Sequence, residues 1–488
     1  MSEAVHASAP ATALPATAPP PATVAFPGDP AYDEATRVYN LAGPARPAAA
    51  VTATSAAEVQ AAIGYAAARG QGVRVHTTGH SAGAAPEMTG AVLIRPVLRG
   101  GVEIDVGRRR AHIPAGTPWN EVVHAAAPHG LAAPHGTSGT VGAVGYLLHG
   151  GVSLYGRKVG LAANHVTAIE LVTAEGRLRR VSLTQDPELF WALRGGGGGL
   201  GVVTAVELAL FPAADLVTGA AFWSWTHAAA VVEAWYDWTL RAPEEVSTSL
   251  RVMNLPDLPM IPPMLKGGPV VCVAGVALGA AHARELLAPL RAVGEPVLDT
   301  WQDAGPETVP EVHMDPDEPG TFIGDHFLLS ELGRDGIAAF LRTTGTGSGT
   351  GTSTGTGTGT GSDSPLIVAE LRQLGGRMAV ADPSGGALNH FEERFAYMGA
   401  GVPELRGTPA EIIEHCDRMR AALAPWDTGR TAPGFVKGLD RPRGHLSEAD
   451  ILAVERVRAR VDPEGLFRGD AMPETVASAL AAHSQEQS

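Results

Sequence analysis

Two segments rich in small residues lie in the first third of this chain, at residues 76–83 (HTTGHSAG) and 136–151. The second carries glycine at 136, 139, 142, 145, 150 and 151 among apolar residues. Glycine has no Cβ, so such a backbone can approach a flat or charged group closely. Loops of this kind also offer several N–H groups to a pyrophosphate. One such segment is typical of a plain tight turn, but two in one domain indicate nucleotide binding.

A third glycine cluster does not indicate a Rossmann unit. The five consecutive glycines 195–199 create a formal match to the G-x-G-x-x-G fingerprint, which ends at Gly201. The match follows a predicted helix at 187–193 and precedes a predicted strand at 202–210. A Rossmann unit requires the opposite order, strand before helix. We therefore assign no dinucleotide fingerprint here.

The length of 488 residues predicts two domains, and 45% hydrophobic with 18% charged residues is typical of a globular protein. A net charge of -15 opposes binding to a polyanion, so we expect no nucleic-acid partner. The two cysteines, Cys272 and Cys416, can form neither a disulfide framework nor a zinc site. We expect no metal and a reducing, cytoplasmic location.

Neither a secretory signal nor a membrane span is expected. The first thirty residues lack a basic start and an apolar stretch, and we interpret 1–28 as a disordered tail. The longest apolar run, 267–281, is interrupted by glycine and proline and is too short to cross a bilayer. No membrane partner is therefore expected.

Periodicity and turn signals place the remaining elements. Ser55 and Glu58 form a capping box for a helix that closes at Gly70, and Thr117 with Pro118 begins a second helix. The other expected elements are strands at 166–172, 177–181 and 270–276, a helix around 284–290, a flexible Gly/Thr/Ser insertion at 343–361, and an amphipathic helix at 446–459. After Phe211-Pro212 the pattern changes to longer elements, which indicates a domain boundary.

Residues 46–212 resemble the FAD-binding domain of the berberine bridge enzyme-like oxidases, in the vanillyl-alcohol oxidase and p-cresol methylhydroxylase superfamily. The matching stretches are 75–81 (VHTTGHS), 134–138 (PHGTS), 148–151 (LHGG), 171–176 (LVTAEG), 186–197 (DPELFWALRGGG), 370–376 (ELRQLGG) and 462–468 (DPEGLFR). The resemblance implies an α+β chain with the two-domain FAD-binding fold of the p-cresol methylhydroxylase type. Its second domain would be an antiparallel sheet covered by helices. The expected divisions are a tail at 1–28, an FAD-binding domain at 29–212, a substrate domain at 213–425, a segment at 426–475 that returns to the FAD domain, and a tail at 476–488.

The resemblance also implies that FAD is bonded covalently to His80 through an 8α-histidyl link. Relatives with a second link have cysteine where this chain has Ser138, so we expect a single attachment. The cofactor contacts implied are His76, Thr77, Thr78, Gly79, His80, Ser81, Gly136, Thr137, Ser138, Val141, Gly142, Gly145, Gly150, Gly151, Val166 and Gly201.

This chain departs from the family at two places. His76 replaces an arginine, and Ala432 and Gly434 occupy the positions of a Tyr-x-Asn whose tyrosine often serves as the base. We therefore expect the proton acceptor elsewhere. The candidates are Tyr155, with a pKa lowered by a nearby positive group, and His149, although both are also typical structural residues. Tyr397 matches no motif.

Three functions remain open at this stage. The first is an oxidase that transfers hydride from a small-molecule substrate, such as a secondary metabolite or a sugar, to flavin and then to molecular oxygen. The second is a flavin-containing cyclase, isomerase or binding protein, because Tyr-x-Asn is absent. The third is a cofactor-free binding module. The sequence does not identify the substrate or the oligomeric state.

Overall fold

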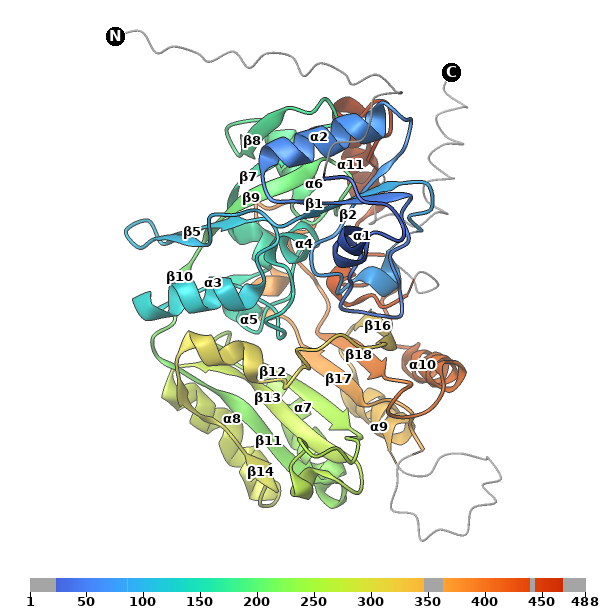
Figure 1. The fold of residues 1–488 in the computed structure, drawn as a ribbon. Helices are drawn as coiled ribbons and strands as arrows, with labels where there is room; N and C mark the ends of the chain where they lie inside the picture. Colours follow the sequence, from blue (N-terminus) through green and yellow to red (C-terminus); the bar gives the residue numbers. More distant parts are fainter. Residues whose placement is uncertain (1–22, 86, 346–362, 439–443, 468–488) are drawn as a thin grey trace.

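The computed structural model describes residues 23–85, 87–345, 363–438 and 444–467. Figure 1 shows smaller sheets in the upper part and one large sheet with its helices in the lower part. The mixture of helices with one parallel and three antiparallel sheets in these ranges confirms the predicted α+β class. None of the helices in these ranges is both long and apolar enough to cross a membrane.

The first sheet is parallel and has the strand order β1-β3-β2. Its elements are α1 (Pro30–Ala35), β1 (Ala49–Ala53), α2 (Ala56–Ala67), β2 (Val73–Val75) and β3 (Val92–Pro96). Half of the predicted capping box is present in helix α2: the Ser55 side chain accepts a hydrogen bond from Glu58 N, but the Glu58 carboxylate accepts from Thr54 N, one residue before the N-cap. It buries Val59 and Ile63 against the strands. The sheet delivers the chain from β2 directly into residues 76–83.

The second sheet has five strands in the order β4-β5-β9-β7-β8, all antiparallel. Its strands are β4 (Glu103–Asp105), β5 (Arg110–Pro114), β7 (Val166–Val172), β8 (Leu178–Ser182) and β9 (Val202–Ala209). The same part of the chain contains helices α3 (Trp119–Ala126), α4 (Ala143–Leu148), α5 (Gly156–Val159) and α6 (Pro187–Leu193), and a separate antiparallel pair of strands, β6 (Leu131–Ala132) and β10 (Phe211–Pro212). The predicted N-cap at Thr117 is wrong. Its hydroxyl donates to Pro114 O at 2.7 Å instead, and α3 begins at Trp119.

The large sheet has eight strands, with β15 paired to β11 beside the path β14-β11-β13-β12-β17-β18-β16. Its elements are β11 (Leu216–Ser224), α7 (Ala228–Thr239), β12 (Val246–Met253), β13 (Val270–Leu278), α8 (Ala280–Val293), β14 (Leu298–Asp299), β15 (Gln302–Ala304), β16 (Ile323–Leu329), α9 (Gly333–Thr344), β17 (Val368–Gln373), β18 (Phe395–Gly401) and α10 (Pro409–Leu423). All of its pairings are antiparallel.

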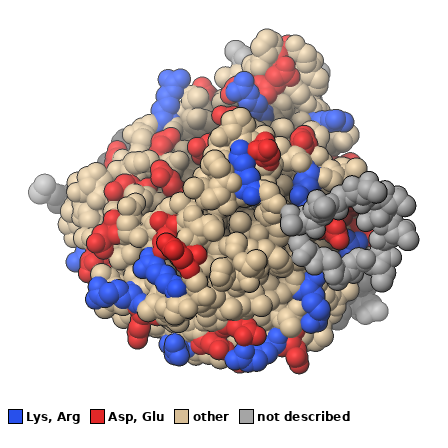
Figure 2. Space-filling view, turned by 90° about the horizontal axis from the view of Figure 1, so that it is seen from below, with Lys and Arg blue, Asp and Glu red and all other residues tan. Residues whose placement is uncertain are grey.

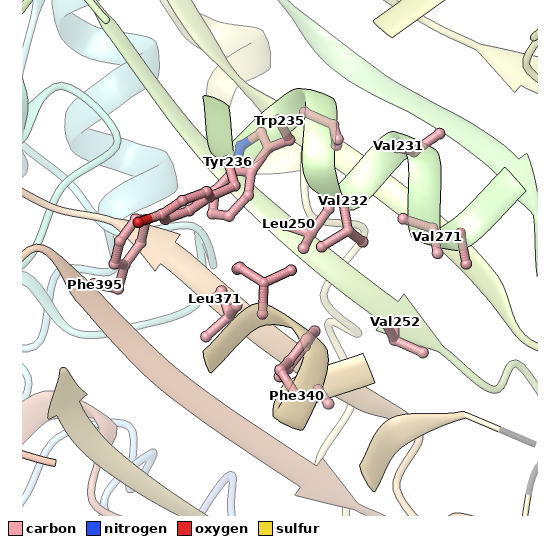
Figure 3. Packing of buried hydrophobic residues seen from close by; sticks show 14 of the residues in the cluster. Val231, Val232, Trp235, Tyr236, Leu250, Val252, Val271, Phe340, Leu371 and Phe395 are labelled. Atoms are coloured by element: carbon pink, nitrogen blue, oxygen red, sulfur yellow. The ribbon is translucent and has the colours of Figure 1, made fainter. Parts of the chain in front are cut away.

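The two faces of the large sheet differ in chemistry, because successive side chains of a strand point to opposite faces. One face is apolar and is covered by helices: Leu250 of β12 and Leu371 of β17 pack with Trp235 of α7 and Phe340 of α9 (Figure 3). The neighbouring positions Ser249, Arg251, Glu370 and Arg372 alternate with these and carry polar side chains that are nonetheless buried. Figure 2 shows the surface of the molecule from below the view of Figure 1, and acidic and basic residues are interspersed there.

The described C-terminal residues pack against the first part of the chain. Helix α11 (Glu448–Val461) places Val454 and Val457 in one apolar cluster with Leu189 of α6. Phe467 then forms a parallel bridge with Val73. The end of the described chain thus contacts the sheets that precede residue 212.

The predicted disordered tail at 1–28 is too long. Ala25 is buried, and its backbone exchanges two hydrogen bonds of 2.9 Å with Ala50 of β1. Residues 23–28 therefore belong to the folded part, and the rest of the predicted tail lies outside the described residues.

The predicted insertion at 343–361 also begins too early. Thr343 and Thr344 form the end of α9, and their hydroxyls donate to the carbonyls of Ala339 and Phe340. The Thr344 side chain is buried. Residues 346–362 lie outside the described part.

We expect a deletion of residues 348–359 to leave the melting temperature nearly unchanged, because glycine, threonine and serine contribute little apolar surface and long loops cost little closure entropy. A deletion that starts at Thr343 should lower the free energy of unfolding by about 1–2 kcal/mol, since it removes two hydrogen bonds and a buried side chain. Urea unfolding of the two variants tests both statements. Equal stability of the two would contradict the corrected boundary.

Candidate functional site

The two glycine-containing segments of the first domain meet in space. Gly142 N donates a hydrogen bond to Thr78 Oγ1 at 3.3 Å, and His80 Nε2 lies 3.0 Å from Thr140 Oγ1. A Cβ on Gly142 would lie 2.5 Å from Thr77 Oγ1, so only glycine permits this approach. Sequence positions some sixty residues apart thus form one surface.

Most glycines of the second segment are explained by packing within the chain. A Cβ at Gly136 or Gly151 would collide with the Tyr146 ring, and one at Gly150 would meet Leu388. Gly145 differs, because a Cβ there would find no atom within 4 Å. Glycine at 136, 150 and 151 is therefore no evidence for a bound group, whereas Gly145 faces open space.

His80 is held on two sides. Its ring stacks on Tyr39, with centroids 3.7 Å apart and planes inclined by 13°, and Tyr39 stacks in turn on Phe322. Burial, together with the positive charge of Lys437, lowers the pKa of His80 to about 3. The imidazole is therefore neutral at pH 7.

The other residues predicted in this region have different surroundings. His76 points to α1, where its Nε2 lies 3.0 Å from Ala35 O, and burial lowers its pKa to about 4. Ser81 is exposed, and Val141 is half-buried. Val166 begins β7 and lies in the apolar core. A Cβ at Gly201 would lie 2.7 Å from Leu171, so this glycine serves close packing.

A loop of the second domain closes over His80. Asn40 Nδ2 donates to Phe322 O at 3.1 Å, and Asn40 also forms a bridge with Gly320. The Tyr39 hydroxyl donates to Pro316 O. Asp315, in the same loop, accepts a hydrogen bond of 3.1 Å from Thr137. These contacts bring the polar face of the large sheet to the surface formed by the glycine segments.

A buried cluster of charged groups occupies that polar face. Arg251 of β12 lies directly opposite Glu370 of β17. Glu370 Oε1 accepts a hydrogen bond of 2.7 Å from Arg372 Nε, and Arg251 Nη1 donates to His313 O at 2.7 Å. Glu370 and Arg372 are 1% and 4% exposed. Charges are rarely buried so completely without a role in structure or function.

Only one oxygen of the Glu370 carboxylate, Oε1, accepts a hydrogen bond in the described structure. Its Oε2 has no hydrogen-bond partner among the described residues and lies 3.8 Å from His313 Nδ1. Burial and the charges of Arg251 and Arg372 lower the pKa of His313 well below its ordinary value, so His313 is neutral. Arg251 Nε and Arg372 Nη1 are likewise without partners in the described ranges.

Sequence reasoning did not assign these side chains to the site. Glu370 and Arg372 were noted only as part of a family match. The available signal was a pair of opposite charges two residues apart in an otherwise apolar strand, which places both on one face. Their partners Arg251 and His313 could not be recognised, because the pairing depends on the register between β12 and β17.

The segment that lacks Tyr-x-Asn lines the same region. Ala432 is buried, and its N–H donates to His326 Nε2 at 2.8 Å. The Phe435 ring lies 4.9 Å from the Arg372 guanidinium. Further along, burial lowers the pKa of Lys437, while nearby Asp315 opposes this shift. This segment therefore contributes the ammonium group of Lys437, although Ala432 and Gly434 provide no ionisable group.

The structure places Tyr155 in an unfavourable setting for a base. It is fully buried with Leu154, Ala213 and Val276, and its hydroxyl has no hydrogen-bond partner among the described residues. Burial raises its pKa, and the negative charge of Glu307 raises it further. The expectation that a nearby positive group lowers this pKa is wrong.

His149 ends helix α4, where its Nδ1 lies 2.7 Å from Gly145 O. This is a local contact with the preceding turn of the helix. Tyr397, on the helix-covered face of the large sheet, packs with Phe327. Within the described ranges no group of three His, Cys, Asp or Glu side chains could hold a metal ion.

Comparisons with known proteins concern the first domain and the fold. Residues 47–182 match the FAD binding domain family. (R)-6-hydroxynicotine oxidase of Paenarthrobacter nicotinovorans is 33% identical over 188 residues, which are 38% of this chain and 41% of that protein. Chitooligosaccharide oxidase of Gibberella zeae is 30% identical over 201 residues, 39% of each chain. The matches thus span about two-fifths of these relatives.

Solved structures extend the likeness to the whole fold. BBE-like 1 of Physcomitrella patens superposes with a TM-score of 0.74 at 18% identity, over 92% of this chain and 96% of the other. 6-Hydroxy-D-nicotine oxidase of Arthrobacter nicotinovorans gives a TM-score of 0.75 at 22% identity, over 91% and 96%. At these identities the likeness concerns the fold.

Proposed function

We propose that this chain is an FAD-dependent oxidase of the berberine bridge enzyme-like type, because residues 47–182 match the FAD binding domain family and solved structures with the same fold include BBE-like 1 and 6-hydroxy-D-nicotine oxidase. The substrate is a small molecule such as a sugar or a secondary metabolite. The observation that carries the proposal is the meeting of the two glycine segments with a buried charged cluster. The relatives include oxidases of 6-hydroxynicotine and of chitooligosaccharides.

The residues of the first domain fit FAD. Gly145 faces open space, and the buried Tyr146 hydroxyl and His135 Nε2 have no hydrogen-bond partner among the described residues. The loops at 77–81 and 136–142 would hold the cofactor. When bound, FAD accepts a hydride and passes two electrons to oxygen.

We assign the covalent link to His80, whose neutral imidazole carries a nucleophilic lone pair. With FAD held there, one ring nitrogen of His80 would bond to the 8α carbon; the imidazole and the 8α-methyl group would each lose one hydrogen, which molecular oxygen would take up as hydrogen peroxide. Cys272 and Cys416 are buried in β13 and α10, which supports a single attachment and a reducing, cytoplasmic setting.

Oxidation of an alcohol or amine also requires a proton acceptor. We assign this part to Glu370 in preference to Tyr155 and His149. Arg372 orients the carboxylate through Oε1, and Oε2 remains without a partner in the described structure. Arg251 Nε and Arg372 Nη1 have no partner among the described residues and can hold oxygen atoms of a substrate.

Replacing Tyr155 with phenylalanine should leave the rate of flavin reduction unchanged, because a buried phenol with a raised pKa is a poor base at neutral pH. The same change should stabilise the protein by about 1 kcal/mol, since it removes a buried hydroxyl without a partner. Rapid-reaction kinetics and urea unfolding measure the two effects. A reduction rate lowered by about a hundredfold would instead make Tyr155 the base.

A screen of sugars, aromatic alcohols and polycyclic metabolites for hydrogen peroxide release tests the oxidase proposal. A substrate should also bleach the flavin under anaerobic conditions. The second candidate, a flavin-containing cyclase or isomerase, is favoured by Ala432 and Gly434 at the Tyr-x-Asn positions. Substrate turnover without anaerobic bleaching would support that candidate and contradict the oxidase.

A further inference from the structure

We propose that Thr140, with Ser138 behind it, is a positioning residue that directs the flavin bond to Nδ1 of His80 and carries away the proton that leaves Nε2. This inference rests on the proposed covalent link to His80. It goes beyond that link, because it names the bonding nitrogen and the groups that prepare it.

The His80 ring and the hydroxyl groups of Thr140 and Ser138 are linked by two successive hydrogen bonds. His80 Nε2 is 3.0 Å from Thr140 Oγ1, and Thr140 Oγ1 is 3.0 Å from Ser138 Oγ. Stacking on Tyr39 fixes the plane of the imidazole, and the contact with Thr140 fixes its rotation within that plane. With Nε2 occupied by Thr140, Nδ1 is the ring nitrogen left to form a bond.

The backbone holds Thr140 in place. Asn120 N donates to Gly139 O at 2.9 Å, and Trp119 N donates to Val141 O at 3.0 Å. A Cβ at Gly139 would overlap the Asn120 side chain, so this close approach requires glycine. The start of α3 thus anchors the residues on both sides of Thr140.

Bond formation at Nδ1 requires its lone pair, and a neutral imidazole then carries its proton on Nε2. After the bond forms, the ring is positively charged until the Nε2 proton leaves. Thr140 Oγ1 can accept that proton while its own proton passes to Ser138 Oγ, and the half-buried Ser138 releases its proton to solvent water, so the imidazole loses one hydrogen overall. The positive charge of Lys437 favours this loss, because it disfavours a protonated ring.

Thr140→Val tests the proposal, because valine keeps the shape of threonine without the hydroxyl. Chain produced without flavin is mixed with FAD, and covalent flavin is followed by fluorescence in denaturing gels. We expect the rate of attachment to fall by about a hundredfold. Thr140→Ser, which keeps the hydroxyl, should attach FAD at the wild-type rate, and Ser138→Ala should be slowed. The yellow colour before denaturation reports whether each variant still binds FAD.

The linkage in the wild-type protein gives a second test that needs no variant. NMR spectroscopy of the isolated flavin peptide should show the bond at Nδ1. A bond at Nε2, or attachment to Thr140→Val at the wild-type rate, would overturn the role of Thr140 while leaving the covalent link intact. Wild-type protein that releases all of its flavin on denaturation would overturn both.

Discussion

Replacing Glu370 with glutamine is expected to slow flavin reduction by the substrate by about a hundredfold or more, because an amide cannot accept the substrate proton. Glutamine has nearly the shape of glutamate and can still accept the hydrogen bond from Arg372 Nε, which is 2.7 Å long in the native protein. Stopped-flow absorbance under anaerobic conditions measures the rate directly.

The same substitution removes the carboxylate charge that pairs with Arg372, and Asp315 remains as a negative group near Arg251 and Arg372. Removing one partner of a buried ion pair typically destabilises a protein by about 3–5 kcal/mol. Glu393→Gln is therefore the matched control, because Glu393 is also buried and pairs with an arginine, Arg430, at 3.3 Å. Both variants should unfold at lower urea concentration, but only Glu370→Gln should lose the reduction step. Equal slowing of the two would contradict the assignment of Glu370.

The sequence predicted local elements well where a strong pattern marked them. The helix at 187–193 agrees with α6, whose first residue is Pro187, and the strand at 166–172 agrees with β7. Proline at a helix start and alternation along a strand are local signals. Thr117 was misassigned because the same residue type also closes turns by donating to a nearby carbonyl.

Only the half of the candidate site that the first domain forms was predictable from the sequence. The sequence brought His80 and residues 136–142 into one group through the family resemblance and the glycine pattern, and the structure places them in contact. Glu370, Arg251 and His313 come from strands and a loop whose meeting depends on tertiary register. Tyr155 follows the second glycine segment in sequence, but its ring turns into an apolar cluster.

Replacing His80 with alanine should abolish covalent attachment, so that denaturation with acid releases all of the flavin into the supernatant. His80 lies in the first glycine segment, its Nε2 is 3.0 Å from Thr140 Oγ1 of the second segment, and its ring stacks on Tyr39; no other group has been assigned the link. His76→Ala is the matched control. It removes an imidazole from the same loop, yet that ring contacts Ala35 of α1 and not Thr140. The control should keep its flavin through precipitation, whereas wild-type protein that already releases all of its flavin would show that the link does not exist. Flavin that stays bound in His80→Ala would move the link to another residue, which sequencing of the flavin peptide would identify.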